Sequence, residues 1–297
     1  MKILEVGKRI ALNNILFATD FSPHSNAALP YALAIARQYG AKLFGAHVLP
    51  SEDYLFVAPD AWPGYVRREE ELQQEASARL EEQIRAVPHE VLSGIGDVWN
   101  VLSRLIGKHD IDLIVVGTHG RTGARKLVMG SIAEKIFRQA ACPVLSVGPS
   151  VSSKPNGEIQ FQNILLATDF GEESLAALPY AISLAEENQA QLALLHVVRE
   201  PAAGILDLEA VRASLMRRLQ ELVPPEAEPW CRVECLVEFG GPPAERIVEI
   251  VTDRAADLII LGVRPTRGAV SMVTHLAYTT AQHIVAHASC PVLTVRG

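Results

Sequence analysis

The chain has 297 residues, 49% of them hydrophobic and 21% charged, a globular composition that excludes general disorder and leaves room for two domains. Its formal net charge of −7 argues against nucleic acid or an anionic membrane surface as a partner. No apolar run approaches the ~18 residues of a membrane-spanning helix, no secretory signal is visible and the four cysteines are dispersed, so we expect a cytoplasmic protein.

The first half of the sequence alternates short apolar runs with segments of helical periodicity. Buried strands are predicted over residues 15–18, 43–49, 91–93, 113–116 and 143–147. Helices are predicted between them, over residues 22–39, 66–86, 98–108 and 131–139. Ser22 is the expected N-cap of the first helix and Gly40 its stop, while Pro30 should kink this helix or delay its regular start.

A sequence repeat divides the chain into two copies of one unit. NILFATDFSPHSNAALPYA at residues 14–32 recurs as NILLATDFGEESLAALPYA at residues 163–181, and the late segment CPVLSV recurs as CPVLTV. Such a repeat predicts a duplicated domain. We expect domains at residues 1–150 and 161–297, joined by a Pro/Ser/Gly-rich linker at residues 151–160.

Alternating strands and helices predict an α/β fold in which each domain is a doubly wound sandwich with a parallel sheet of five strands. The last strand of each unit, in CPVLSV and CPVLTV, is uniformly apolar and would form an exposed edge. We therefore expect the two domains to pair through their last strands across a pseudo-twofold axis. Pairing of the whole chain with a second copy stays open as an alternative.

Two loops follow predicted strands at the edge of the sheet where open α/β folds bind ligands. One is the A-T-D-F-S turn at residues 18–22, and the other is a glycine-rich loop over residues 117–131 that carries Arg121, Arg125 and Lys126. Glycines let a backbone approach a ligand, and the start of a helix favours phosphate. The second loop is therefore a predicted phosphate-binding loop, although it is not a Walker A sequence.

These paired motifs resemble the universal stress protein family, in a tandem-domain form. The glycine-rich loop matches the family pattern G-x2-G-x9-G-[ST]. The resemblance implies an adenine nucleotide alpha hydrolase-like fold and a site for ATP or AMP, with Mg²⁺ or Mn²⁺ as a further cofactor and Asp20 as the candidate metal ligand. The candidate nucleotide-binding residues are Ala18, Thr19, Asp20, Val48, Gly117, Gly120, Arg121, Gly130 and Ser131.

The second copy of the loop departs from the family pattern. Its second glycine is Pro265, its third is His275 and its serine is Leu276, while Asp169 still follows the first strand. The proline also removes an N–H donor. The first unit carries 16 basic and 16 acidic side chains, and the second carries 11 and 18. We expect one competent nucleotide site, in the first unit, and a degenerate second unit.

Structural explanations stay open for several of these residues. Asp20 could cap the helix that follows it, and Ser131 could be the N-cap of the helix that it opens. His47, next to the end of its predicted strand, is expected to be structural rather than catalytic. His119 is expected to pack the glycine-rich loop.

The resulting hypothesis is an ATP-binding universal stress protein that acts as a nucleotide-dependent stress-response or signalling module. At most slow ATP hydrolysis is expected, because no paired carboxylates, Ser-His-Asp set or metal cluster can be assembled near the loop. The alternative is a nucleotide-independent protein-interaction scaffold in stress resistance. An adenylating enzyme of the same superfamily is disfavoured, because its glycine-serine motif is absent from the A-T-D-F-S turn.

Overall fold

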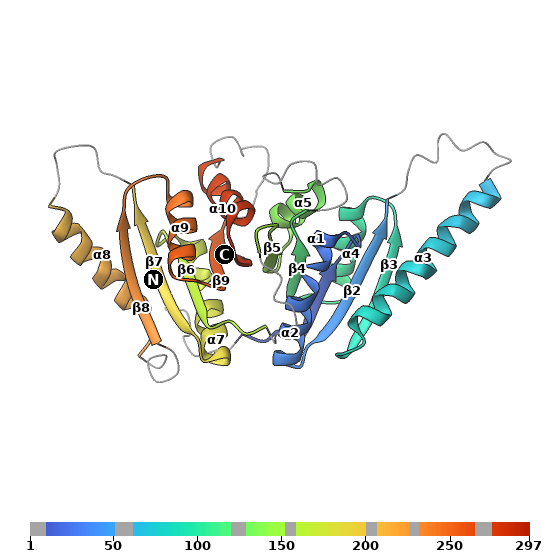
Figure 1. The fold of residues 1–297 in the computed structure, drawn as a ribbon, viewed down its shortest axis with the longest axis horizontal. Helices are drawn as coiled ribbons and strands as arrows, with labels where there is room; N and C mark the ends of the chain where they lie inside the picture. Colours follow the sequence, from blue (N-terminus) through green and yellow to red (C-terminus); the bar gives the residue numbers. More distant parts are fainter. Residues whose placement is uncertain are drawn as a thin grey trace.

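The computed structural model describes residues 10–50, 62–119, 129–151, 159–199, 207–225, 232–264 and 275–297. These residues form one continuous sheet of ten strands with helices packed on it (Figure 1). Its strand order is β3-β2-β1-β4-β5-β10-β9-β6-β7-β8. The two halves of the chain therefore lie side by side in a single sheet.

Each half contributes five strands, and all neighbouring strands within a half are parallel. The elements of the first half are β1 (Asn14–Ala18), α1 (Pro23–Asn26), α2 (Leu29–Tyr39), β2 (Lys42–Leu49), α3 (Trp62–Ile84), β3 (His89–Ile95), α4 (Val98–Lys108), β4 (Leu113–Gly117), α5 (Ser131–Gln139) and β5 (Val144–Val147). Those of the second half are β6 (Asn163–Ala167), α6 (Glu172–Ala176), α7 (Leu178–Asn188), β7 (Gln191–Val198), α8 (Leu208–Leu222), β8 (Arg232–Phe239), α9 (Pro243–Asp253), β9 (Leu258–Val263), α10 (His275–His287) and β10 (Val292–Arg296). The predicted doubly wound α/β fold is confirmed.

The helix predicted after β1 is divided into two helices. Ser22 caps α1, because its hydroxyl accepts the backbone N–H of Ser25 at 3.1 Å. The longer α2 has Pro30 in its first turn and ends at Gly40, which has a φ of 63°. A proline is tolerated in the first turn because the N–H there needs no intrahelical acceptor. Pro30 thus delays the regular helix, as predicted.

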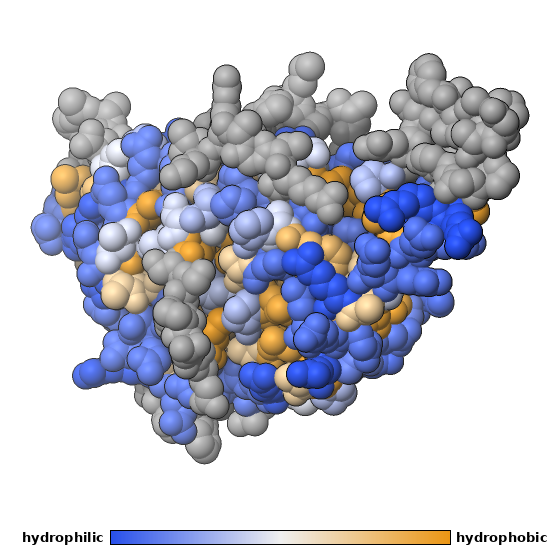
Figure 2. Space-filling view, turned by 45° about the vertical axis from the view of Figure 1, so that its right-hand side comes forward, coloured by the Kyte–Doolittle hydropathy of each residue, from blue (hydrophilic) through white to orange (hydrophobic). Residues whose placement is uncertain are grey.

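The third strand is longer than predicted, because β3 runs alongside β2 from the pair Leu43–His89 to the pair Leu49–Ile95. As an edge strand it carries polar residues and glycine, which hide its apolar period. Figure 2 shows this side of the molecule, with hydrophilic residues along the right-hand flank and apolar residues nearer the middle. No helix in the described ranges combines the length and the apolar character needed to cross a membrane.

The two halves meet through their last strands, as the repeated apolar edges predicted. Strands β5 and β10 pair antiparallel, with Leu145 opposite Leu293. These leucines hold the same position in CPVLSV and CPVLTV, so a pseudo-twofold axis passes between them. The hydroxyl of Thr294 also donates to the carbonyl of Val144, at 3.2 Å. Each edge strand therefore covers the other.

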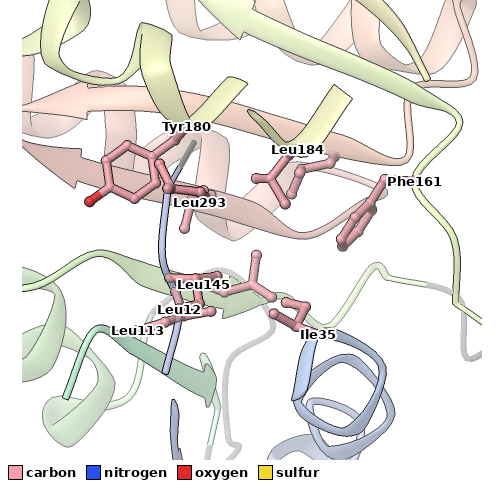
Figure 3. A pocket seen from close by; sticks show the side chains of 10 residues that line it. Leu12, Ile35, Leu113, Leu145, Phe161, Tyr180, Leu184 and Leu293 are labelled. Atoms are coloured by element: carbon pink, nitrogen blue, oxygen red, sulfur yellow. The ribbon is translucent and has the colours of Figure 1, made fainter. Parts of the chain in front are cut away.

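We call the antiparallel pairing of β5 with β10 the seam. Apolar side chains from both halves fill the space beneath it (Figure 3). They are Ile10, Leu12, Ile35, Leu113, Leu145, Phe161, Tyr180, Leu184, Leu258 and Leu293. The cavity left among them measures about 10 Å³, which is too small for an organic ligand. The ring of Tyr31 stacks against Phe161 nearby, with 6.4 Å between their centroids. The seam is thus a packed core shared by both halves.

Candidate functional site

A cavity of about 310 Å³ lies at the carboxyl ends of β1, β2 and β4 in the first half. Seven of the predicted site residues line it: Ala18, Thr19, Asp20, Val48, Gly117, Gly130 and Ser131. The other two, Gly120 and Arg121, lie outside the described residues. The structure therefore brings together all the predicted residues that it describes.

The turn after β1 is held by its own side chains. The Thr19 hydroxyl bonds the Ser25 hydroxyl at 2.9 Å and accepts the N–H of Phe21 at 2.9 Å. The Asp20 carboxylate accepts the N–H of Ser22 at 3.0 Å. Because Ser22 is the N-cap of α1, Asp20 is not the helix cap that sequence left open. Thr19 and Asp20 therefore both hold the turn, and both line the cavity.

A histidine, a phenylalanine and an arginine brace this turn from outside. Phe21 has a φ of 61°, a left-handed conformation that is unfavourable for a bulky side chain. The His47 ring lies 4.7 Å from the Phe21 ring and bonds the Thr19 carbonyl through Nδ1 at 2.8 Å, while the Arg79 guanidinium lies 4.5 Å above Phe21. The second half repeats these contacts with its own residues, Thr168, Phe170, His196 and Arg218. His47 is structural, as expected, but it also lines the cavity.

The first glycine of the loop pattern is required by helix packing. A Cβ atom at Gly117 would lie 2.7 Å from the Ser25 Cα and closer still to the His24 carbonyl. Real Cβ atoms essentially never approach another atom within 3.0 Å. At Gly262, the equivalent position, a Cβ would meet the backbone of Glu173 in the same way. This packing explains why the glycine persists in the second half, where the rest of the pattern is lost.

The amino end of α5 faces the cavity. Its N-cap is Gly130, with φ −61° and ψ 146°, and Ser131 is the first helical residue. The alternative interpretation of Ser131 as the N-cap is therefore wrong by one residue. The first intrahelical bond runs from the N–H of Glu134 to the Gly130 carbonyl, so the three preceding N–H groups have no acceptor within the helix. Such a helix end favours an anion.

The remaining wall of the cavity is largely apolar. Pairing of β1 with β2 ends at Ala46, so Val48 extends beyond the end of β1. Opposite it, the helix α4 contributes Val98 and Leu102, and α5 contributes Ile136. No motif in the sequence marks these residues as part of the site, because only the packing of α4 and α5 on the sheet brings them there. The cavity thus combines an apolar slot with a carboxylate and a helix amino end.

Two imidazoles, one of which lines the cavity, lie next to each other in the first half, and the second half has an ion pair at the equivalent positions. His119 is 5% exposed, bonds the Thr118 hydroxyl through Nδ1 at 2.9 Å, and lies 5.6 Å from the ring of His24. At the equivalent positions, Arg264 pairs with Glu173 at 3.5 Å. His119 therefore contacts Thr118 and His24 and borders the cavity, while residues 120–128 of the loop that it is expected to pack lie outside the described part.

The second half retains the acid of its turn in a tightly bonded form. Burial raises the pKa of Asp169, but hydrogen bonds from the Gly171 N–H at 2.9 Å and the Ser174 hydroxyl at 2.8 Å outweigh burial, so the net pKa is lowered. Asp169 is therefore committed to its own turn. Residues 265–274, which include Pro265, lie outside the described part, as do the side chains of His275 and Leu276.

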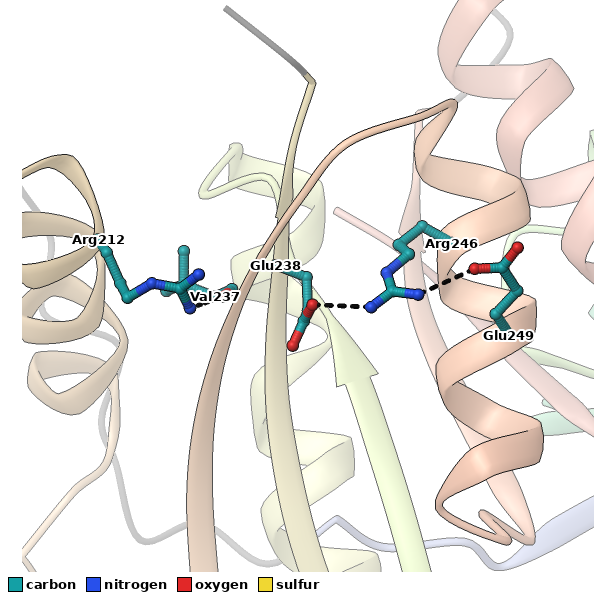
Figure 4. Close-up of polar contacts among 5 residues, drawn as sticks. All are labelled: Arg212, Val237, Glu238, Arg246 and Glu249. Atoms are coloured by element: carbon teal, nitrogen blue, oxygen red, sulfur yellow. Dashed lines mark hydrogen bonds and ion pairs between the residues drawn. The ribbon is translucent and has the colours of Figure 1, made fainter. Parts of the chain in front are cut away.

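Helix α9 and strand β8 are joined by charge in the second half (Figure 4). Arg246 bonds Glu238 and Glu249, each at 2.9 Å. In the first half these positions on the strand and helix hold Gly94 and Val101, packed so closely that a Cβ at Gly94 would lie 2.6 Å from a Val101 methyl. An apolar contact in one half thus corresponds to an ion-pair cluster in the other.

The described residues contain no group of three or more His, Cys, Asp or Glu side chains arranged to hold a metal ion. Asp20 is the one carboxylate among the described residues that line the first-half cavity. A cation at this position would therefore need further oxygen ligands from a bound molecule or from water.

Comparison with known proteins agrees with the fold. The sequence model of the universal stress protein family matches residues 12–148 and 160–296. Universal stress protein A homolog 1 of Coxiella burnetii is 37% identical over 139 residues, which cover 45% of this chain and 94% of the relative. Universal stress protein MJ0531 of Methanocaldococcus jannaschii is 30% identical over 138 residues, which cover 45% and 80%. The crystal structure of a universal stress protein from Archaeoglobus fulgidus covers 97% of this chain and 99% of its own, with a TM-score of 0.70 at 19% identity. The chain therefore belongs to the universal stress protein family and carries two copies of its domain in tandem.

Proposed function

We propose that the first half binds ATP in the cavity between β1, β2, β4 and α5, and that the protein is a nucleotide-dependent stress-response or signalling module. The observation that carries this proposal is the convergence of three kinds of surface on one cavity of about 310 Å³. An apolar slot, a carboxylate and a helix amino end match the base, the ribose and the phosphates of a nucleotide, respectively.

Each part of the nucleotide has a proposed set of contacts. The adenine lies in the slot beside Ala18 and the backbone of Val48, and Asp20 accepts a hydrogen bond from a ribose hydroxyl or from the adenine amino group. The phosphates lie against Gly130 and the N–H groups that open α5, where the Ser131 hydroxyl adds a donor. Gly120 and Arg121 belong to the same proposed phosphate-binding loop.

A divalent cation, Mg²⁺ or Mn²⁺, is proposed to accompany the phosphates. Mg²⁺ is commonly held by one or two carboxylates together with phosphate oxygens, and Asp20 supplies the carboxylate here. A bound cation would neutralise phosphate charge. Since the described lining contains a single acid that also holds its own turn, we propose ATP hydrolysis that is slow at most.

We propose one nucleotide site per chain. In the second half, the position of His119 holds Arg264, which is paired with Glu173, and Asp169 is bonded to Ser174. The substitutions Pro265 and His275 remove glycines of the family pattern. This half is proposed to serve the structure of the sheet or the regulation of the first half.

Calorimetric titration with ATP and AMP, with and without Mg²⁺, tests the proposal, together with chromatography of any nucleotide released from the purified, denatured protein. We expect one site per chain. Asp20→Asn should weaken binding by about tenfold or more, because a hydrogen bond to a charged group contributes about 1.5–3 kcal/mol. Asparagine can still accept the Ser22 N–H, which protects the turn.

Asp169→Asn is the matched control, since it makes the same change in the other half and should leave affinity and stoichiometry unaltered. Gly130→Val should abolish binding by placing a side chain at the start of α5. Two equivalent sites per chain, or equal losses from both asparagine variants, would contradict the assignment to the first half.

A nucleotide-independent interaction scaffold is the second candidate function. It is favoured by the second half, which keeps the braced turn and Gly262 although its loop has lost the family pattern. These features can therefore serve the fold alone. No heat with millimolar ATP and Mg²⁺, and no nucleotide in the purified protein, would support the scaffold over the nucleotide module.

A further inference from the structure

The second half has a groove of about 370 Å³ at the opposite edge of the sheet from the proposed nucleotide site. It lies at the amino ends of β6, β7 and β8, beneath the end of α9. Residues that matter for its chemistry are Asn163, Gln191, Ala193, Arg232, Glu234 and Arg254. Its volume is within the range of small-molecule sites, about 300–1,000 Å³.

An aromatic ring fills the corresponding space in the first half. Phe44 pairs with Leu16 on β1, as Ala193 pairs with Leu165 on β6, so Phe44 and Ala193 hold equivalent positions. The Phe44 side chain is 4% exposed, and its ring lies 4.8 Å from the ring of His109. The first half therefore shows what kind of group this part of the fold accommodates.

Two substitutions empty the space in the second half. Alanine replaces phenylalanine at position 193, and Ala256 takes the place of Ile111, which is 6% exposed in the first half. Both changes remove apolar volume from the same region, between the sheet and the end of the crossover helix. The groove is therefore a difference in side-chain volume between two copies of one backbone.

An arginine replaces the histidine whose ring is tilted by 53° against that of Phe44. His109 and Arg254 are the C-caps of α4 and α9, and each is followed by a residue with positive φ. Arg254 donates to both carboxylate oxygens of Glu234, at 2.6 and 3.1 Å. This two-point contact fixes the plane of the guanidinium and balances its charge.

We propose that this groove binds a small aromatic molecule of the phenol or indole class, with its ring where Phe44 lies in the first half and against the Arg254 guanidinium. Guanidinium groups stack on aromatic faces. Glu234 balances the charge of Arg254, and Arg232 adds a second cation to the lining, so the ring contact with Arg254 does not itself require an acidic ligand. Asn163 and Gln191 lie at the same groove, where an amide can bond a ring hydroxyl or N–H.

Ligand-detected NMR titration of the full chain with phenol and indole tests the proposal, with cyclohexanol as a non-aromatic ligand of similar size. We expect saturable binding of both aromatics and at least fivefold weaker binding of cyclohexanol. Ala193→Phe should abolish binding, because the new ring occupies the groove as Phe44 does in the first half. Ala193→Ser is the matched control and should bind within about twofold of the unaltered chain.

Arg254→Lys keeps the charge but removes the planar surface. Binding should weaken about two- to thirtyfold, the range that corresponds to a cation–π contact of 0.5–2 kcal/mol. This variant decides the question if Ala193→Phe does not fold. Equal binding of cyclohexanol and phenol, or undiminished binding by folded Ala193→Phe or by Arg254→Lys, would overturn the proposal.

Discussion

Replacing Gly117 with alanine should destabilise the protein in the absence of any ligand. The new Cβ would lie 2.7 Å from the Ser25 Cα, about 0.5 Å or more inside normal contact, and the obstructing atoms are backbone. Helix α1 would have to move away from β4. Overpacking of this kind costs typically about 1–3 kcal/mol. In a cooperative folding unit of about 150–250 residues, a loss of about 2 kcal/mol in the free energy of unfolding lowers the melting temperature by about 4–8 °C.

Differential scanning calorimetry of nucleotide-free protein measures this effect. Gly262→Ala should cause a loss of similar size, because its Cβ would meet the Glu173 backbone. Gly107→Ala is the control: its Cβ has no neighbour within 4 Å, and alanine within a helix should raise stability by about 0.5–1 kcal/mol. If Gly117→Ala left the melting temperature of the nucleotide-free protein unchanged, the packing explanation for this glycine would be refuted.

Three further predictions concern the seam and the titratable groups. Leu293→Ala should lower the free energy of unfolding by about 2–5 kcal/mol in urea titrations, since this leucine is 4% exposed beneath the seam; a loss below 1 kcal/mol would contradict tight packing there. The hydrogen bond to Glu81, with help from the Val87 carbonyl, raises the pKa of His89, so its stabilisation is complete below the unfolded pKa and lost as pH rises through the folded pKa. The melting-temperature difference between His89→Ala and the unaltered chain should therefore be larger at pH 5.5 than at pH 8.5, and the reverse order would be inconsistent with the raised pKa. Burial raises the pKa of Cys142 to about 11 and that of Cys290 to about 12, so both thiols should react with iodoacetamide far more slowly at pH 8 in the native protein than in urea, as mass spectrometry would show.

Local patterns predicted the elements and the seam well. The bounds of α4 and α5 match the predicted helices, since a strong apolar period and short flanking turns define both. The seam followed from two apolar edge strands in one chain, because an unprotected apolar edge must be covered. Described residues of both candidate loops line one cavity, as the sequence predicted, because parallel strands place their carboxyl ends at a common edge of the sheet.

The features of the site that could not be predicted from the sequence depend on contacts between distant residues. The need for glycine at position 117 arises from the close crossing of α1, which the spacing of glycines does not encode. The N-cap of α5 is Gly130, as its extended backbone angles show, whereas the sequence had left Ser131 open as the cap. Leu102 reaches the cavity only because α4 packs on that face of the sheet.

The exchange of Phe44 for Ala193 illustrates a different limit. Each residue is ordinary in a strand, and the repeat is strong enough to align them. Only the structure shows that the Phe44 ring fills this space in the first half and that a groove lies beside Ala193 in the second. The sequences of the two copies do not show how much free space surrounds each side chain.

The joining of the two halves in one chain across the β5–β10 pairing has a consequence for how such molecules diverge. Three residue pairs are in register there, next to the apolar core that both halves share. Tethering raises the local concentration of each partner to about millimolar for short flexible connections. A fused pair therefore stays together even where substitutions in one half weaken the contact between them. In a symmetric dimer every mutation appears in both subunits, but in a fused pair it appears in one half only. One copy can therefore acquire chemistry that the other lacks.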